Sequence, residues 1–308
     1  MIIKKIIMIM KIIISIDEIL YTYDSNSIKI ENYSDNDIIS NDLKLIKEDE
    51  NCLIYNLDEC INCNPGYYLI NKTCIKYSFK AIYKSESDNE NITLINNLPT
   101  DIIEMIVDGE IANPSKYYLF PFKGNHTIHI LLNITNCTSL REMFSFINKM
   151  ISITFTSYFN TENIEDMSFM FMACTSLTSI NISIFNTQKL KVIEAMFDCC
   201  FSMISVDFSN LNLENVEIMY KLFYLCTSLT YINFSNVKTF NLTDNVGMLH
   251  ECISLTSIDL SSLYTNKPIN PLNMFFHNIN LSYIDISSFK CASSLNYNIY
   301  TDLPDYGI

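Results

Sequence analysis

Four cysteines, at positions 52, 60, 63 and 74, lie close together along the chain around a Pro65-Gly66 turn. A segment this short has too little apolar surface for a core of its own, and such segments are usually held by disulfides or by a metal ion. The C-x-x-C pair of Cys60 and Cys63 suits zinc. The wider spacing of Cys52 and Cys60 and a secretory-type start favour disulfides. The cysteines therefore predict two disulfides in one of three pairings, with zinc as the alternative.

Motifs for catalysis are missing from the sequence. The five glycines exclude the dinucleotide-binding and Walker fingerprints, and neither H-E-x-x-H nor G-x-S-x-G occurs. His126 and His129 stand in an expected strand, on opposite faces, and we expect both to be at the surface. His250 lies close to Cys252 but has no evident acidic partner. We predict that the protein is not an enzyme and has no catalytic residue, metal or cofactor.

Composition and charge limit the classes to which the protein could belong. Hydrophobic residues make up 49% of the 308, enough for a large core. The formal net charge is −14, and no cluster of lysine and arginine is visible. Because nucleic-acid binding needs clustered basic residues to displace counterions from phosphates, we expect no nucleic-acid partner.

The N-terminal third reads as three segments. Residues 1–15, "MIIKKIIMIMKIIIS", have the charged start and apolar run of a signal peptide, with an amphipathic strand or helix as the alternative. Residues 16–50 form a polar, acidic spacer, and residues 51–77 form the cysteine-rich module. No later stretch approaches the ~18–20 apolar residues of a membrane-spanning helix. We therefore expect a secreted or extracellular cell-surface protein with no membrane span beyond the signal segment.

From about residue 143 the chain repeats at a fixed interval. Cys174, Cys200, Cys226 and Cys252 are evenly spaced and define the period. The same interval separates the members of the sets Met170, Met196, Leu222, Met248, Met274 and Leu177, Met203, Leu229, Leu255, Leu281. Compositional bias can supply many apolar residues but cannot hold them in register. We interpret the ladder cysteines as reduced core residues. Cys137, Cys199 and Cys291 are weaker disulfide candidates.

Two periodicities alternate within one repeat unit. "LTSINI" has the alternation of a strand around Ile180, and "FNTQKLKVIEAMF" places Leu190, Ile193 and Phe197 at helical spacing. Because one unit cannot bury its apolar face alone, neighbours must stack. The predicted fold class is α/β: a leucine-rich-repeat-like solenoid over residues 143–308, with one short parallel strand and one short helix per unit. Residues 78–142 would form its N-terminal cap.

Two resemblances follow from these residues. "FNTENIEDMSFMFMACTSLTSINISIFNT" and "ECISLTSIDLSSL" resemble the 26-residue repeat of BspA-like leucine-rich-repeat surface proteins, over about Thr127 to Phe289. This resemblance implies a secreted or cell-surface interaction protein, often linked to adhesion. "YYLFPFKGNHTIHILL" looks like the segment that leads into such arrays, so we expect it to form the cap strand over the first unit. The run "C..C.PGYYL....C" resembles furin-like and growth-factor-receptor cysteine-rich repeats.

Two departures from the repeat are expected to change the structure locally. Pro268 and Pro271 interrupt the helical segment of one unit, so we expect irregular backbone there. Asn278 replaces the ladder cysteine in the last unit, which should serve as the C-terminal cap.

The residues that alternate with the core predict a ligand-binding face. They are Ser179, Asn181, Ser205, Asp207, Tyr231, Asn233, Ser257, Asp259, Tyr283 and Asp285. We expect this face to bind a protein or glycan on a cell surface or in a matrix, although its Asp/Asn column could also hold a divalent cation. The alternative is a coat or wall component that assembles laterally without a discrete ligand. Asn181 and Asn233 lie in glycosylation sequons, and glycans on both would prevent protein docking there.

Overall fold

The computed structural model describes residues 19–24, 27–32, 51–56, 59–264 and 273–288 of the chain. The chain divides into two compact parts, residues 1–48 and 49–308. In the first part, the described residues form one antiparallel hairpin of β1 (Ile19–Asp24) and β2 (Ser27–Asn32). The predicted signal peptide and most of the predicted spacer lie outside the described residues, as do Pro268, Pro271 and Cys291.

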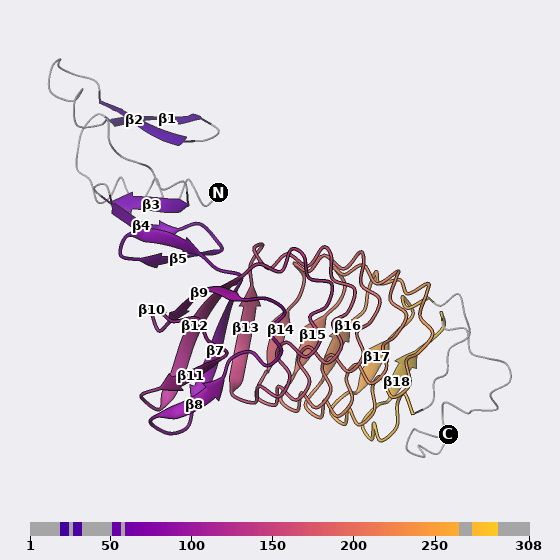
Figure 1. The fold of residues 1–308 in the computed structure, drawn as a ribbon. Helices are drawn as coiled ribbons and strands as arrows, with labels where there is room; N and C mark the ends of the chain where they lie inside the picture. The colour runs from indigo at the N-terminus through magenta and orange to yellow at the C-terminus, as the bar shows by residue number, and fades with distance from the viewer. Residues whose placement is uncertain (1–18, 25–26, 33–50, 57–58, 265–272, 289–308) are drawn as a thin grey trace. The chain divides into compact units, whose positions relative to one another are not determined.

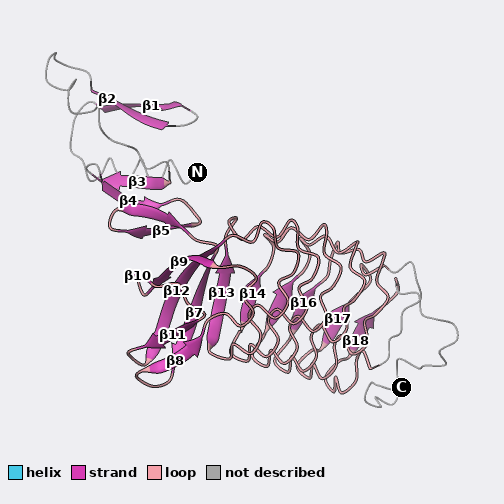
Figure 2. Ribbon diagram, in the orientation of Figure 1, coloured by secondary structure: helices cyan, strands magenta, loops and turns pink. Residues whose placement is uncertain are grey.

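Every regular element in the described ranges is a strand (Figure 2). The predicted α/β class, a leucine-rich-repeat-like solenoid with a helix in each unit, is therefore wrong. Since these ranges contain no helix, they also contain none that could cross a membrane. Before the repeats come β3 (Cys52–Asn56), β4 (Glu59–Cys63), β5 (Tyr67–Ile70), β6 (Thr73–Lys76), β7 (Phe79–Ser85), β8 (Glu90–Thr93), β9 (Ile102–Val107), β10 (Glu110–Ala112), β11 (Tyr117–Phe120) and β12 (Gly124–Leu132). The repeat strands are β13 (Met150–Phe155), β14 (Ser179–Asn181), β15 (Ser205–Asp207), β16 (Tyr231–Asn233), β17 (Ser257–Asp259) and β18 (Tyr283–Asp285).

The strands do not form one parallel repeat sheet. Eight of them join in a mixed sheet of order β10-β9-β12-β7-β13-β14-β15-β16, and β17 pairs with β18 in a separate sheet. Within the mixed sheet, β13 to β16 are parallel, with Ile153, Ile180, Val206 and Ile232 as successive partners. Figure 1 shows these short strands side by side, each followed by turns that lead to the next.

The segment expected to be helical is a series of turns bonded to the neighbouring unit. Leu190, Ile193 and Phe197 are buried, as their spacing requires. The amides of Ile193 and Phe197, however, donate to the carbonyls of Ile218 and Leu222 in the next unit, both at 3.0 Å. In a helix they would donate to the residue four positions earlier. Consecutive turns bury positions three or four apart just as a helix does, so the spacing alone could not distinguish the two.

Left-handed residues keep these turns from becoming a helix. Ala195 and Cys199 have φ of 49° and 59°, a conformation that interrupts a right-handed helix. Both positions recur once in each repeat unit. The first column holds Phe169, Ala195, Lys221, Gly247 and Asn273, and the second holds Ala173, Cys199, Leu225, Glu251 and His277.

A phenylalanine ladder runs through the core of the repeat units. Phe144, Phe171, Phe197 and Phe223 stack in sequence with ring centroids 5.3, 5.6 and 5.6 Å apart. All four side chains are fully buried. Stacked rings at this separation contribute to stability beyond the burial of their apolar surface. The recurring Met-Phe pairs are therefore core residues of successive units.

The cysteine ladder is confirmed as a set of free, buried thiols. Each Sγ donates a hydrogen bond to a buried backbone carbonyl: Cys174 to Phe144, Cys200 to Phe171, Cys226 to Phe197 and Cys252 to Phe223, at 3.0 to 3.2 Å. In the last unit Asn278 does the same, with its Nδ2 2.7 Å from the carbonyl oxygen of Leu249. The ladder position thus requires a small side chain that can donate a hydrogen bond, which explains why asparagine can replace cysteine there. Cys137 and Cys199 are also free, so neither forms a disulfide.

The cap differs from the expected arrangement. The segment expected to cover the first repeat unit, residues 117–132, instead forms β11, paired with β8, and β12, paired with β7 and β9. The strand beside β13 is β7. Phe79, Ala81 and Tyr83 on β7 are fully buried, and so supply the apolar surface that the first repeat unit packs against.

Candidate functional site

The ten residues predicted to bind a ligand lie on β14 to β18, two on each strand. Seven are exposed, and Ser205, Asn233 and Asp285 are half-buried. The residue between each pair points inward and is buried in four strands: Ile180, Val206, Ile232 and Ile258. The strand alternation of the sequence therefore places the side chains on the expected sides of the sheet.

The Asn/Asp column also has a structural role that sequence reasoning missed. Each side-chain Oδ1 accepts the backbone amide two residues later, an Asx turn that ends the strand. The pairs are Asn181–Ser183, Asp207–Ser209, Asn233–Ser235, Asp259–Ser261 and Asp285–Ser287, at 2.8 to 3.0 Å. Hydrogen bonds from Ser209 hold the pKa of Asp207 below its ordinary value, and those from Ser287 do the same for the pKa of Asp285.

Five of the ten predicted residues meet in one shallow hollow of about 370 Å³. They are Ser179, Asn181, Ser205, Asp207 and Tyr231. The Tyr231 side chain is prominent there because the residue is 59% exposed. The other five do not line this hollow, and four of them lie on β17 and β18, outside the mixed sheet. The predicted face is thus divided, and its best-formed part lies over β14 to β16.

A second polar hollow of about 300 Å³ lies on the turns that follow these strands. Asn210 borders both hollows, and Glu214 and Lys238 bring charges of both signs to the second. A ligand larger than the first hollow would therefore continue over a polar surface rather than an apolar one.

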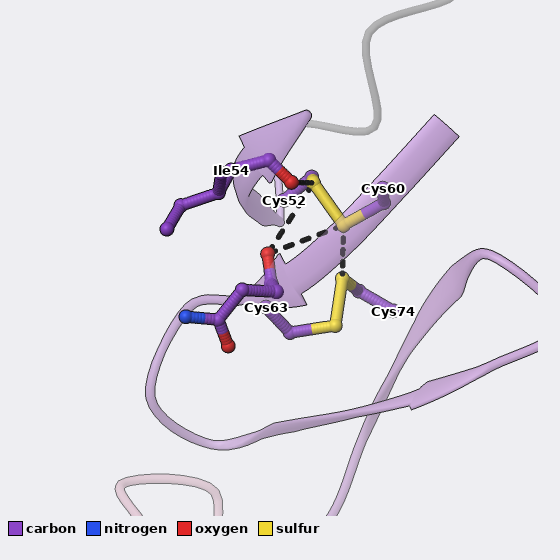
Figure 3. The surroundings of a disulfide bond; sticks show 6 residues. Cys52, Ile54, Cys60, Cys63 and Cys74 are labelled. Carbon is purple, nitrogen blue, oxygen red and sulfur yellow. Dashed lines mark hydrogen bonds between the residues drawn. A yellow bond between two sulfur atoms is a disulfide. The ribbon is translucent and has the colours of Figure 1, made fainter. Parts of the chain in front are cut away.

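The cysteine-rich module forms two disulfides, Cys52–Cys60 and Cys63–Cys74 (Figure 3). Of the three pairings left open by the sequence, this one links neighbours along the chain. The two bonds lie against each other, with Cys60 Sγ 3.4 Å from Cys74 Sγ. The sulfurs of Cys52, Cys60 and Cys74 all lie within 4.8 Å of one another. In the disulfide state these sulfurs are not available as thiolate ligands, which is the form zinc requires.

A serine, a histidine and an aspartate that sequence reasoning did not connect meet in the cap. Ser85 Oγ lies 3.1 Å from His126 Nε2, and His126 Nδ1 lies 2.7 Å from Asp108 Oδ2. These are the contacts of a serine-hydrolase triad. However, Ser85 is fully buried, donates to the Phe122 carbonyl at 2.8 Å and accepts the Gly124 amide at 2.9 Å. The hydroxyl is enclosed by its own backbone partners, and the group acts as a link between strands.

The expectation that His126 and His129 lie at the surface is wrong, since they are 6% and 3% exposed. They do lie on opposite faces of β12, but both faces of this strand are covered. His129 packs between the rings of Tyr68 and Tyr77, with centroids 4.2 and 4.8 Å away. Burial, with a smaller effect of Lys80, lowers the pKa of His129 from 6.5 to about 4.

Comparison with known proteins identifies a family but no function. Residues 124–232 and 202–299 both match the family described as Mycoplasma protein of unknown function, DUF285, and together they span more than half of the chain. No curated protein and no solved structure matches the chain. The two overlapping matches cover the repeat units and the last cap strand, β12, but not the cysteine-rich module.

Proposed function

The chain belongs to the DUF285 family, and on that premise we propose that it is a non-enzymatic, secreted or cell-surface interaction protein. Its ligand, a protein or glycan on a cell surface or in a matrix, binds the exposed face of β14 to β16. The observation that carries this proposal is the hollow formed by Ser179, Asn181, Ser205, Asp207 and Tyr231.

The chemistry of this hollow suits a polar ligand. Asn181 and Asp207 are held in place by their Asx turns, so their side chains lose little freedom when a ligand binds. Tyr231 offers a ring for contact and a hydroxyl for hydrogen bonding. Because the strands repeat in register, similar groups recur at a spacing of ~4.8 Å, which suits an extended or repeating ligand.

The disulfides support an extracellular location. Structural disulfides persist in oxidising compartments and are rare in the cytosol. Both lie in the small module, whereas the six free cysteines among the described residues lie in the cap and the repeat units. The module thus relies on disulfides where its apolar surface is small, and the repeat units rely on their core.

A binding assay with two matched variants tests the proposal. Tyr231 and Tyr283 occupy equivalent positions on β16 and β18 and are 59% and 57% exposed, but only Tyr231 lines the hollow. The purified chain, made in a host without N-glycosylation, would be applied to a glycan array and to cell and matrix preparations. Tyr231→Ala should weaken the binding that is found by about tenfold or more, the loss of a contact worth ~1.4 kcal/mol.

The variants distinguish the outcomes. A loss in Tyr231→Ala with unchanged binding in Tyr283→Ala supports a ligand in the hollow. An equal loss of binding in the two variants would show that the site extends along the exposed face from β16 to β18. Full binding in both variants would contradict the proposed face. Concentration-dependent polymerisation without binding to any preparation would favour a coat or wall component.

A further inference from the structure

Two exposed tyrosines stand at the same position of repeat units that are two apart. Tyr231 is the first residue of β16 and Tyr283 is the first residue of β18, and each is more than half exposed. The exposed Ser257 holds this position in the unit between them, on β17. Because serine is small, the two tyrosine side chains border an open interval on the exposed face.

Backbone hydrogen bonds hold these three units directly against one another. The amide of Phe223 donates to the carbonyl of Met248 at 2.9 Å and joins the units of β16 and β17. The amide of Leu249 donates to the carbonyl of Met274 at 3.0 Å and joins the units of β17 and β18. Figure 1 shows the three strands side by side. Neighbouring strands lie ~4.8 Å apart, so two units span about 10 Å along the row of strands.

The polar column beside the tyrosines suits a ligand that carries hydroxyl groups. In the same three strands this column holds Asn233, Asp259 and Asp285, whose side chains are oriented by their Asx turns. Each turn uses one side-chain oxygen, and an ionised carboxylate keeps further acceptor capacity for hydroxyl donors. The ten residues of the face include three aspartates and no lysine or arginine. Since like charges across an interface repel, the face disfavours an anionic ligand.

We propose that the ligand is an uncharged, linear β-1,4-linked glycan that runs across the strands and lies over Tyr231 and Tyr283. This proposal rests on the function proposed above and specifies its ligand. In an extended glycan of this linkage, one sugar ring is about as long as the strand spacing of ~4.8 Å. Successive rings are turned over, so every second ring presents the same side to the protein. The two tyrosines therefore meet equivalent rings, and each offers an apolar surface to the ring together with a polar tip.

Peptides match the face less well. The side chains of an extended strand return to the same face every second residue, at ~6.7 Å, which is too short for the two tyrosines. A polyproline helix repeats every third residue, at ~9.3 Å, and does match their spacing. Proline, however, has no backbone N–H, so such a peptide would bring few donors to the acceptors of the polar column. The polar column therefore favours the glycan.

Isothermal calorimetry with cello-oligosaccharides and chito-oligosaccharides tests the proposal, using the full chain made in a host without N-glycosylation. In at least one series the hexasaccharide should bind more tightly than the disaccharide, because only the longer ligand reaches both tyrosines. Tyr231→Ala and Tyr283→Ala should each weaken hexasaccharide binding by about tenfold or more. Tyr117 on β11 is 54% exposed but belongs to the cap, so Tyr117→Ala should bind as the wild type does.

The possible failures separate the glycan from the proposed function. The glycan proposal is overturned if neither hexasaccharide binds, if both variants of the face keep wild-type affinity, or if the carboxylated, anionic form of the same glycan binds equally well. A proline-rich peptide whose binding depends on Tyr231 and Tyr283 would also overturn it, while leaving the exposed face as the binding surface. The proposed function itself fails if no ligand, whether glycan, peptide, cell or matrix preparation, depends on Tyr231.

Discussion

Lowering the pH should destabilise the protein through His129, the buried histidine of β12. Its ring lies between Tyr68 and Tyr77, both in the cysteine-rich module, and its Nδ1 has no hydrogen-bond partner among the described residues. Its strand partners are Lys80 on β7 and Ile106 on β9. A proton on this ring would be buried without an acceptor at Nδ1 and close to a lysine, which is why burial and Lys80 lower its pKa to about 4.

The pKa shift determines the size and the sign of the effect. An unfolded histidine titrates near 6.5, whereas the folded ring stays neutral down to about pH 4. Between these values the unfolded state binds the additional proton, so stability falls as the pH decreases through this window. Each pKa unit corresponds to ~1.4 kcal/mol, so the complete loss is about 3 kcal/mol. Below pH 4 this histidine contributes no further loss.

The measurement is the free energy of unfolding of the wild type and of His129→Phe, at pH values from about 7.5 to 3.5. Denaturant unfolding can be followed by tyrosine fluorescence, because the chain has 19 tyrosines and no tryptophan. Phenylalanine keeps an aromatic ring in contact with Tyr68 and Tyr77 and cannot titrate. As the pH falls, the free energy of unfolding of the wild type should decrease by about 3 kcal/mol more than that of His129→Phe. All other titratable groups are the same in the two proteins, so their contributions to the pH dependence cancel in the difference. Equal pH dependence in the two proteins would refute the reasoning.

Two further variants test the core and the cap. Cys226→Ala removes the thiol that donates to the Phe197 carbonyl and should lower the free energy of unfolding by about 1–3 kcal/mol, while Cys199→Ala should change it little. If denaturant unfolding shows equal effects of Cys226→Ala and Cys199→Ala, the hydrogen bond from Cys226 to the Phe197 carbonyl does not contribute as expected. Ser85→Ala should destabilise by a similar ~1–3 kcal/mol, because two backbone groups lose their buried partner. Ser85 should also resist fluorophosphonate labelling, and a labelled Ser85 would reveal an accessible nucleophile.

The candidate site was predictable in part. Strand alternation around Ile180 and its equivalents placed the exposed residues of each repeat strand on one side, as the structure shows. The hollow around Tyr231 was not predictable, because it depends on β14 to β16 sharing a sheet that β17 and β18 do not join. The contact between Ser85 and His126 was not predictable either. The two residues are 41 positions apart in the sequence, and their strands, β7 and β12, become neighbours only in the sheet.

The repeat period and the buried positions could be read from the sequence alone. Leu177, Leu229 and Leu281 occupy the same position of their repeat units and are all buried, because a position that contacts its own equivalent in the next unit must stay apolar in every unit. The secondary structure of the connecting segments was decided only by the tertiary structure. Turns and helices bury residues at the same spacing. The choice between them depends on whether the backbone amides form hydrogen bonds within their own segment or with the neighbouring unit. Hydrogen bonds to the neighbouring unit can form only once the units lie together.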